Sequence, residues 1–169
     1  VLNGIYGVFA FRYFRLYSIA VAEVITHISR NLIKQCVKEI QSTRRLTVIA
    51  GDTDSIIVHS NEKVDWFELS EKLNEKVSFY LKEHYNIDNK YLRLECETIF
   101  ENLLMTKAKK KYYGEGYFVK GKRFDELKQY GRGIDLVKKD TPLKLRPIIK
   151  KLLISIIRSN DEEEIKSAI

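Results

Sequence analysis

Two short apolar runs separated by a polar turn constrain the fold of this chain more than any other feature. Leu46–Ala50 and Ile56–Val58 are rich in β-branched residues, and the segment Gly-Asp-Thr-Asp-Ser separates them. Such a pattern predicts a hairpin of two buried strands with its turn in the polar segment. Asp52 and Asp54 would then lie close together, on or beside the tip of the hairpin.

This pair of acids is suited to a metal ion. Carboxylates held together at the rim of a sheet are ligands that hard divalent cations such as Mg²⁺ prefer. Buried strands on both sides would keep the turn rigid, as a metal site requires. Asp and Gly are also common in ordinary turns, so Gly-Asp-Thr-Asp alone favours an acidic turn that binds nothing over a metal site.

The remaining sequence alternates between helical and strand-like periodicity. Apolar residues recur at helical spacing in two segments, predicted as amphipathic helices: Tyr17–Ile40 and Asp65–Tyr85, the second with Asp65 as its N-cap. Three later segments alternate as strands do: Tyr91–Glu97, Ile99–Thr106 and Lys110–Tyr117. After a turn-prone break at Tyr130–Gly133, helices are expected from Pro142 to Ile157 and from Asn160 onward. This order predicts the α+β class with an antiparallel sheet.

The net charge of +7 is concentrated in the last third of the chain. From Met105 to Arg158 there are 16 Lys and Arg residues against 5 Asp and Glu. A concentrated cationic surface favours a polyanion such as nucleic acid, although a basic face turned to solvent gives the same composition.

Cysteine usage and hydropathy exclude several classes of protein. Cys36 and Cys96 lie far apart, without CxxC spacing or a His-rich neighbourhood, which argues against a disulfide framework or a zinc site. No stretch reaches the roughly 18 apolar residues of a membrane span, so we expect an intracellular protein with no membrane partner. The chain begins at Val1 without an initiator Met, and we expect a fragment of a longer protein.

The complete run around the acidic turn resembles motif C of family B DNA polymerases, except that Ala50 replaces the family's usual Tyr before the Gly. The resemblance implies that Asp54 is a direct ligand of two catalytic Mg²⁺ ions, that Asp52 supports the site, and that Thr53 lies at the nucleotide. In that mechanism one ion lowers the pKa of the primer 3′-hydroxyl and the other neutralises the triphosphate and the leaving pyrophosphate. The family's second metal-binding Asp lies in an upstream motif outside this chain, so the chain alone is not expected to polymerise.

The start of the chain adds a second match. Asn3-Gly4-Ile5-Tyr6-Gly7 resembles the end of motif B, whose family form is Asn-Ser-x-Tyr-Gly. By that resemblance Asn3 and Tyr6 bind the incoming nucleotide, with Tyr6 under the nascent base pair.

Two basic segments follow in the family's order. Lys109, Lys110, Lys111 and Tyr112 resemble the family's Lys-Lys-Arg-Tyr segment, which implies a strand that binds primer phosphates and the minor groove, with Tyr112 near a sugar. Lys138 and Lys139 stand where two Arg are usual in the connection to the thumb, and would clamp the duplex backbone. Taken alone, the Lys107–Lys111 run is also typical of a solvated charge patch.

Together these matches imply an antiparallel palm sheet with packed helices that leads into a mostly helical thumb. The expected domains are a partial palm at residues 1–130 and the start of a thumb at 131–169. The implied function is template-directed DNA synthesis, with primer-template DNA, deoxynucleoside triphosphates and the remainder of the polymerase as partners, in a nucleus, an archaeal cytoplasm or a viral replication site. The alternatives are a separate subunit or degenerate relative that binds duplex DNA without activity of its own, and a basic structural domain with a chance acidic turn.

Overall fold

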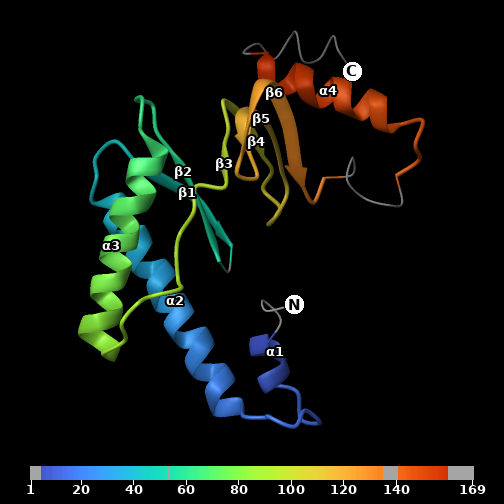
Figure 1. Ribbon diagram of the computed structural model, residues 1–169. Helices are drawn as coiled ribbons and strands as arrows, with labels where there is room; N and C mark the ends of the chain where they lie inside the picture. The colour runs from blue at the N-terminus through green and yellow to red at the C-terminus, as the bar shows by residue number, and fades with distance from the viewer. Residues whose placement is uncertain (1–4, 53, 135–140, 160–169) are drawn as a thin grey trace. The chain divides into compact units, whose positions relative to one another are not determined.

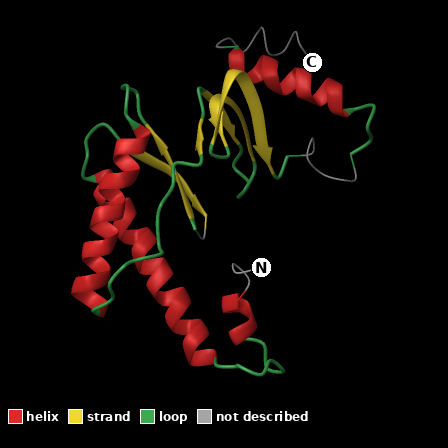
Figure 2. Cartoon of the chain, viewed as in Figure 1, coloured by secondary structure: helices red, strands yellow, loops and turns green. Residues whose placement is uncertain are grey.

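The computed structural model describes residues 5–52, 54–134 and 141–159. The chain forms two compact units, Val1–Leu94 and Glu95–Ile169. Figures 1 and 2 show helices and antiparallel strands in both units, which confirms the predicted α+β class.

The first unit contains two long helices and a β-hairpin. Its elements are α1 (Ile5–Phe9), α2 (Ile19–Gln41), β1 (Thr47–Asp52), β2 (Ser55–His59) and α3 (Trp66–Tyr85). The predicted N-cap of α3 is confirmed, because the Asp65 carboxylate accepts hydrogen bonds of 3.0 Å from the backbone N–H groups of Phe67 and Glu68. These donors have no partner within the helix, so the cap stabilises its first turn. Asn86 ends α3 in the left-handed conformation, with φ of 51°.

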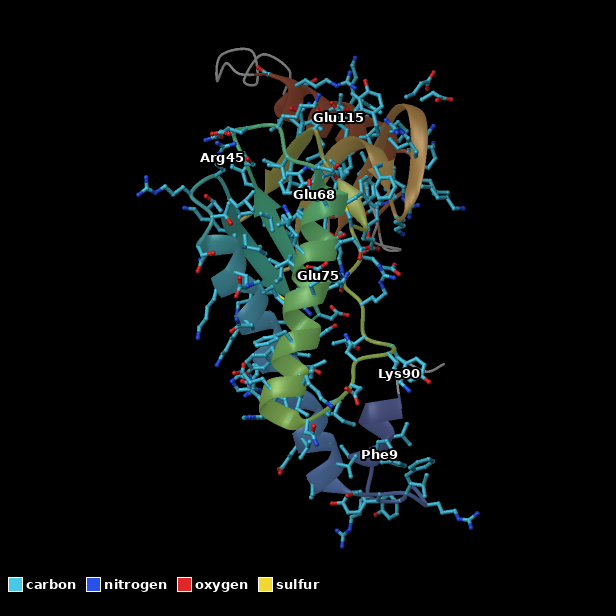
Figure 3. All side chains as sticks on the ribbon, turned by 60° about the vertical axis from the view of Figure 1, so that its left-hand side comes forward. Phe9, Arg45, Glu68, Glu75, Lys90 and Glu115 are labelled. Carbon is cyan, nitrogen blue, oxygen red and sulfur yellow. The ribbon has the colours of Figure 1, made fainter. Side chains whose placement is uncertain are left out.

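The core of the first unit lies between α2 and α3. Its buried residues are Leu32, Cys36, Val77 and Leu81. Burial raises the pKa of the Cys36 thiol to about 11, so this side chain stays neutral and acts as an apolar residue. Charged residues such as Glu68 and Glu75 occupy the exposed side of α3 (Figure 3), as the helical period predicts.

The predicted hairpin is present, but its strands are not buried. Along β1, Val48, Ala50 and Asp52 are half-buried, whereas the residues between them are exposed, and Ile49 is 44% exposed. The sheet has only two strands, and contacts to it come from α2. A sheet covered on one side alternates between covered and exposed residues, and β1 shows this pattern, whereas Ser55–Val58 of β2 are all half-buried.

The strand predicted at Tyr91–Glu97 is wrong. A side chain of α3 forms hydrogen bonds with the backbone there. The Asn74 amide donates to the Leu94 carbonyl at 3.0 Å and accepts from the Leu94 N–H at 2.7 Å. The alternating sequence is compatible with a strand, but extended residues form a sheet only when another strand supplies their hydrogen bonds.

The second unit is an antiparallel sheet followed by a helix. Its elements are β3 (Thr98–Ile99), β4 (Asn102–Met105), β5 (Tyr112–Val119), β6 (Lys122–Arg132) and α4 (Arg146–Arg158). β5 is central, because it pairs with β6 and also with both β3 and β4. The predicted strand at Ile99–Thr106 is thus two strands, interrupted at Phe100 and Glu101.

Strand β6 was not predicted, and the break expected at Tyr130–Gly133 is wrong in part because Tyr130–Arg132 is the end of this strand. The sequence of β6 is rich in charged residues and has weak strand propensity. Its conformation follows from pairing with β5 along most of its length.

Glycine at position 116 of β5 is required by a close approach of the chain. A Cβ atom there would overlap the carbonyl oxygen of Ile99, and one at Gly114 would lie 2.6 Å from the carbonyl oxygen of Asn102. The two glycines therefore allow the interrupted segment between β3 and β4 to lie against β5.

Helix α4 begins later than predicted, at Arg146 rather than at Pro142, with Pro147 in its first turn. Pro142 instead belongs to the preceding turn, where its carbonyl accepts a hydrogen bond from Leu145. The helix expected from Asn160 lies outside the described residues. None of the described helices combines the length and apolar character needed to cross a membrane.

Candidate functional site

The tip of the first hairpin is a two-residue turn. Strand pairing continues to Asp52 and Ser55, which lie opposite each other, so that the chain reverses between them with Asp54 in the turn. The Ser55 hydroxyl donates to the Asp52 carbonyl at 3.3 Å, which adds a contact across the tip. Asp52 is half-buried at the end of β1, whereas Asp54 is exposed in the turn. The structure thus brings the two predicted acids together in different surroundings.

The pairing of β1 with β2 contains a β-bulge that the sequence did not reveal. Val48 lies opposite Val58, but the next pair joins Ala50 to Ile57, so Ile49 is an extra residue on β1. Bulges bend and twist a strand locally and often lie next to active sites.

The chemistry of the hairpin tip fits a magnesium ion. Asp52 and Asp54 supply carboxylate oxygens, the ligands that Mg²⁺ prefers, whereas an octahedral ion needs six ligands. Within the described ranges, no group of three or more His, Cys, Asp or Glu residues could hold a metal. The two acids can therefore supply part of a metal site.

The basic segment forms a second polar turn, between β4 and β5. Lys109, Lys110 and Lys111 were predicted on a strand, and this is wrong: β5 begins only at Tyr112. The N–H and the hydroxyl of Thr106 both bond the Lys111 carbonyl, each at 3.1 Å, and close the turn. Lys110 takes a left-handed conformation, with φ of 64°, which reverses the chain and is incompatible with a strand. All four lysines of this basic turn, Lys107 and Lys109–Lys111, are exposed.

Tyr112 belongs to an aromatic cluster. Its ring centroid lies 6.1 Å from that of Phe100 and 6.2 Å from that of Tyr130, in edge-to-face arrangements. The ammonium group of Lys120 lies 4.8 Å from the centre of the Tyr130 ring. Burial, and next to it the neighbouring Tyr130, raise the pKa of the Tyr112 hydroxyl. Tyr130 was not predicted here because its Tyr-Gly-Arg-Gly surroundings favour a turn.

The other predicted site residues are less informative. Asn3, Thr53, Lys138 and Lys139 lie outside the described residues. Tyr6 lies in the short helix α1. The acids belong to the first unit and the basic turn with Tyr112 to the second.

The second unit also buries an acid that the sequence analysis did not identify. Glu115 of β5 is fully buried and accepts two hydrogen bonds from the Arg158 guanidinium of α4, at 2.8 and 2.7 Å. The Asn102 amide donates a third, at 3.3 Å. Arg158, and then Asn102, hold the pKa of the Glu115 carboxyl below its ordinary value of 4.5 despite the opposing effect of burial. The separation of 43 positions along the chain explains why no local pattern indicated the pair.

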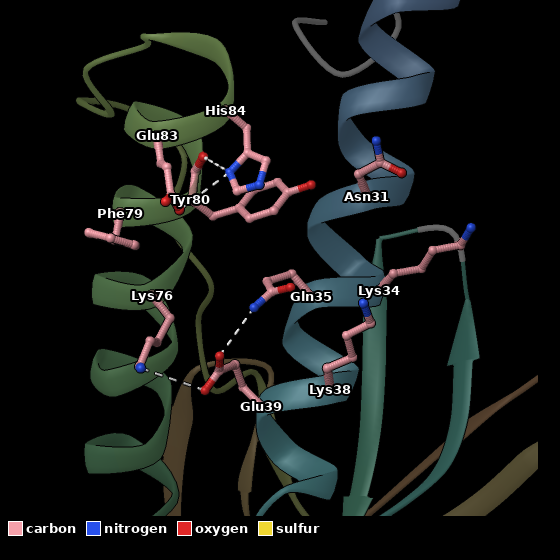
Figure 4. A pocket seen from close by; sticks show the side chains of 10 residues that line it. All are labelled: Asn31, Lys34, Gln35, Lys38, Glu39, Lys76, Phe79, Tyr80, Glu83 and His84. Carbon is pink, nitrogen blue, oxygen red and sulfur yellow. Dashed lines mark hydrogen bonds and ion pairs between the residues drawn. The ribbon is translucent and has the colours of Figure 1, made fainter.

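A hollow of about 390 Å³ between α2 and α3 (Figure 4) contains none of the predicted site residues. Glu39 pairs there with Lys76 at 3.8 Å and accepts a hydrogen bond from Gln35 at 3.1 Å. The Tyr80 and His84 rings stack with centroids 4.1 Å apart. These side chains contact one another, and none of them was predicted as a site residue. We therefore assign the candidate site to the hairpin tip.

Comparison with known proteins assigns this sequence to a family. The chain matches the model for DNA polymerase family B over residues 1–169. It is 32% identical over 169 residues to DNA polymerase 1 of Sulfolobus acidocaldarius, covering 98% of this chain and 17% of that protein. It is 29% identical over 167 residues to the DNA polymerase alpha catalytic subunit of Arabidopsis thaliana, and this match covers 99% of this chain and 10% of that protein. It is 33% identical over 145 residues to the same subunit of Xenopus laevis, and this match covers 82% of this chain and 9% of that protein.

The chain spans between 9% and 17% of the length of these relatives. Because the family model matches every residue of the sequence, the chain belongs to DNA polymerase family B.

Proposed function

We propose that this chain forms the second half of the palm, residues 1–130, and the start of the thumb, residues 131–169, of a polymerase that copies a DNA template. The observation that carries the proposal is the two-residue turn that joins Asp52 and Asp54 at the tip of a hairpin. In a family B polymerase this turn would face the primer 3′-hydroxyl and the incoming deoxynucleoside triphosphate.

The two acids have separate roles in this proposal. Asp54 is exposed in the turn and would bind both Mg²⁺ ions, while Asp52 is fixed by strand pairing and would support the site. When bound, the ions would lower the pKa of the primer hydroxyl and neutralise the phosphates. A second Asp ligand would come from another part of the polymerase, and Asn3, Tyr6 and Thr53 would contact the nucleotide.

The basic turn would bind the DNA backbone. Its four lysines are exposed at a chain reversal, where long cationic side chains can reach phosphates without recognising bases. Tyr112 follows the turn directly, and its ring is held by Phe100 and Tyr130 for packing against a sugar. Lys138 and Lys139 would extend this contact along the duplex.

Primer extension by the complete polymerase tests the proposal. Asp54→Ala should lower the extension rate by about a thousandfold or more, because loss of a metal ligand removes several kcal/mol of charge stabilisation. Primer-template affinity should stay within about twofold. Asp125→Ala, at an exposed acid of β6, is the matched control and should leave extension unchanged. Full extension by the Asp54→Ala protein would contradict the assignment.

A second candidate function is a separate subunit, or a degenerate relative, that binds duplex DNA without catalysis. The exposed lysines of the basic turn favour it, since phosphate binding does not require the acids. Mixing this chain with a fragment that bears the upstream motifs distinguishes the two functions. Restored Mg²⁺-dependent extension would exclude a role in binding alone.

A further inference from the structure

Helix α4 lies beside the sheet of the second unit and buries none of its residues completely (Figure 1). It contacts β4, and its last turns, Leu152–Ile157, are half-buried throughout. Ile148, nearer its start, is 64% exposed. A fully buried apolar side chain locks a helix through the close fit around it, and α4 has no such side chain. Another feature must therefore set its exact position on the sheet.

The apolar sequence of α4 repeats along the helix. Three apolar pairs follow one another at intervals of four residues: Ile148-Ile149, Leu152-Leu153 and Ile156-Ile157. Four residues are close to one helical turn, and they advance the helix by about 6 Å. A slide of α4 by one turn would therefore present nearly the same apolar pairs to the sheet. Such one-turn shifts between packed elements are a known mode of conformational change.

The pair between Glu115 and Arg158, by contrast, fits one position of the helix. The Arg158 Nε donates to one carboxylate oxygen at 2.8 Å, and its Nη2 donates to the other at 2.7 Å. The planar guanidinium matches a carboxylate in this two-pronged way only in a narrow range of orientations. Asn102, which lies opposite Glu115 in the pairing of β4 with β5, donates a third bond at 3.3 Å and holds the carboxylate from the neighbouring strand.

A slide of α4 by one turn in either direction would break this pair. In one direction it would bring Ile154, four residues before Arg158, to the place of the arginine. Glu115 is fully buried and would then keep its charge with no cation beside it, which strongly destabilises a protein. The apolar pairs tolerate the slide and the buried carboxylate does not, so the ion pair decides the register.

We propose that Glu115 and Arg158 are positioning residues: they hold α4 in one register on the sheet, and the polymerase uses this register to retain primer-template DNA. The second part rests on the proposed function, in which residues 131–169 begin the thumb. Lys150 and Lys151 are exposed on α4, and a slide by one turn would move these cations by about 6 Å relative to the sheet. The ion pair would act only through the position of the helix, without touching DNA or nucleotide.

Replacing both partners by Met in the complete polymerase tests the inference. Glu115→Met with Arg158→Met removes the pair that marks the register but leaves no unpaired charge, so the variant should fold. Spin labels on unnatural amino acids at Lys151 of α4 and Asp125 of β6, both exposed, report the position of the helix by double electron–electron resonance. The parent protein should give one narrow distance. The double variant should give a second population, displaced by up to about 6 Å.

Dissociation of primer-template DNA gives the second measurement. We expect the dissociation rate of the double variant, followed with a fluorescent primer and excess competitor, to rise about tenfold, because contacts made by α4 are lost in the second register. The rate of nucleotide addition with saturating DNA should stay within about twofold, since the acids at the hairpin are unchanged. An ion pair that only adds stability would leave both the distance and the dissociation rate unchanged, because the Met pair leaves no unpaired charge.

Two further variants are controls. Arg158→Lys keeps a cation beside Glu115 and should retain the single distance, with a dissociation rate within about threefold of the parent, although the two-pronged geometry is lost. Tyr113→Phe changes a buried residue on the same face of β5, whose hydroxyl has no hydrogen-bond partner among the described residues, and should match the parent protein. If the double variant has no thermal transition, Glu115→Gln with Arg158→Met replaces it, because the amide keeps an acceptor for Asn102.

One narrow distance in the folded double variant would overturn the register role of the pair. A second distance with unchanged DNA dissociation would overturn the use of the register in DNA binding. Asp54→Ala, assayed in parallel, keeps this inference apart from the proposed function, because it should keep the parent distance and dissociation rate while it loses extension. If Asp54→Ala retains extension, the proposed function fails, whereas the distance measurement still decides the register.

Discussion

Two acids, one in each unit, show how surroundings determine what a carboxylate can do. Asp54 is exposed in a two-residue turn, whereas Glu115 is fully buried in the central strand of its sheet and bonded to Arg158 and Asn102. The charge of Glu115 is neutralised within its own unit, so it stabilises the sheet and has little capacity left for a ligand. A charge at an exposed turn adds little to stability and is open to a metal ion.

Truncation of the buried acid should have the largest effect on stability. Glu115→Ala leaves Arg158 and Asn102 without their acceptor, and we expect a loss of about 3 kcal/mol in the free energy of unfolding, at the low end for a broken ion pair because Arg158 is half exposed. Asp54→Ala should change it by less than about 0.5 kcal/mol. Urea unfolding measures the free energy of unfolding of both variants. Equal losses in the two variants would contradict the difference that we draw between the two acids.

The matched control removes both charges. Glu115→Met with Arg158→Met should lose much less than Glu115→Ala, because no unpaired charge is then left beside the sheet. The pH dependence offers a second measurement. The folded-state pKa of Glu115 lies below its ordinary value of 4.5, so its contribution is complete above pH 4.5 and is lost as the pH falls further, through the folded-state pKa. This loss should be absent in the double variant.

A glycine in each unit provides the second comparison. Gly116→Ala should destabilise the sheet by about 1–3 kcal/mol, because the new methyl group overlaps the Ile99 carbonyl and β5 or β3 must shift. Gly51→Ala is the matched change in β1, where the nearest atom to the new methyl group is 3.7 Å away. Its thermal unfolding midpoint should equal that of the wild type or exceed it.

The two polar turns should respond to different ions. Replacing both Lys109 and Lys111 by Ala should reduce the slope of log K against log salt for duplex binding by about 1.8, since each phosphate contact contributes about 0.9. The Mg²⁺ dependence of extension should not change. The Asp54→Ala variant should show the reverse pattern, with a normal salt slope. An unaltered slope in the lysine variant would remove the basic turn from the DNA interface.

The smallest expected effect concerns the backbone of the basic turn. Lys110 has φ of 64°, a conformation that costs a residue with a Cβ atom about 1 kcal/mol more than glycine. Lys110→Gly should therefore raise the free energy of unfolding of the second unit by about 0.5 kcal/mol, after the greater entropy of an unfolded glycine is subtracted. Lys109→Gly, outside the left-handed region, should lower it.

Local sequence patterns predicted the parts of the fold that local forces determine. The spacing of apolar residues identified α2 and α3, and the carboxylate of Asp65 identified the start of α3. Strand β6 depends on its partner β5 more than on its own charged sequence, and it was missed. The Glu115–Arg158 pair was missed because its partners are far apart in the sequence. The Ile49 bulge was missed because the apolar pattern of two strands does not reveal a shift in their register. For the site, the sequence pattern predicted both acids at the hairpin but not that Asp52 is half-buried while Asp54 is exposed.

The side-chain amide of Asn74 resembles the peptide group through which paired strands form hydrogen bonds. Its amide has the same donor and acceptor as a peptide unit, and both engage Leu94 as one rung of a ladder would. A single residue on a helix therefore supplies both hydrogen bonds that one strand residue would supply, at the point where the first unit ends. An aspartate at this position would have the same shape but would face the Leu94 carbonyl with a negative charge, so the mimicry is specific to the amide.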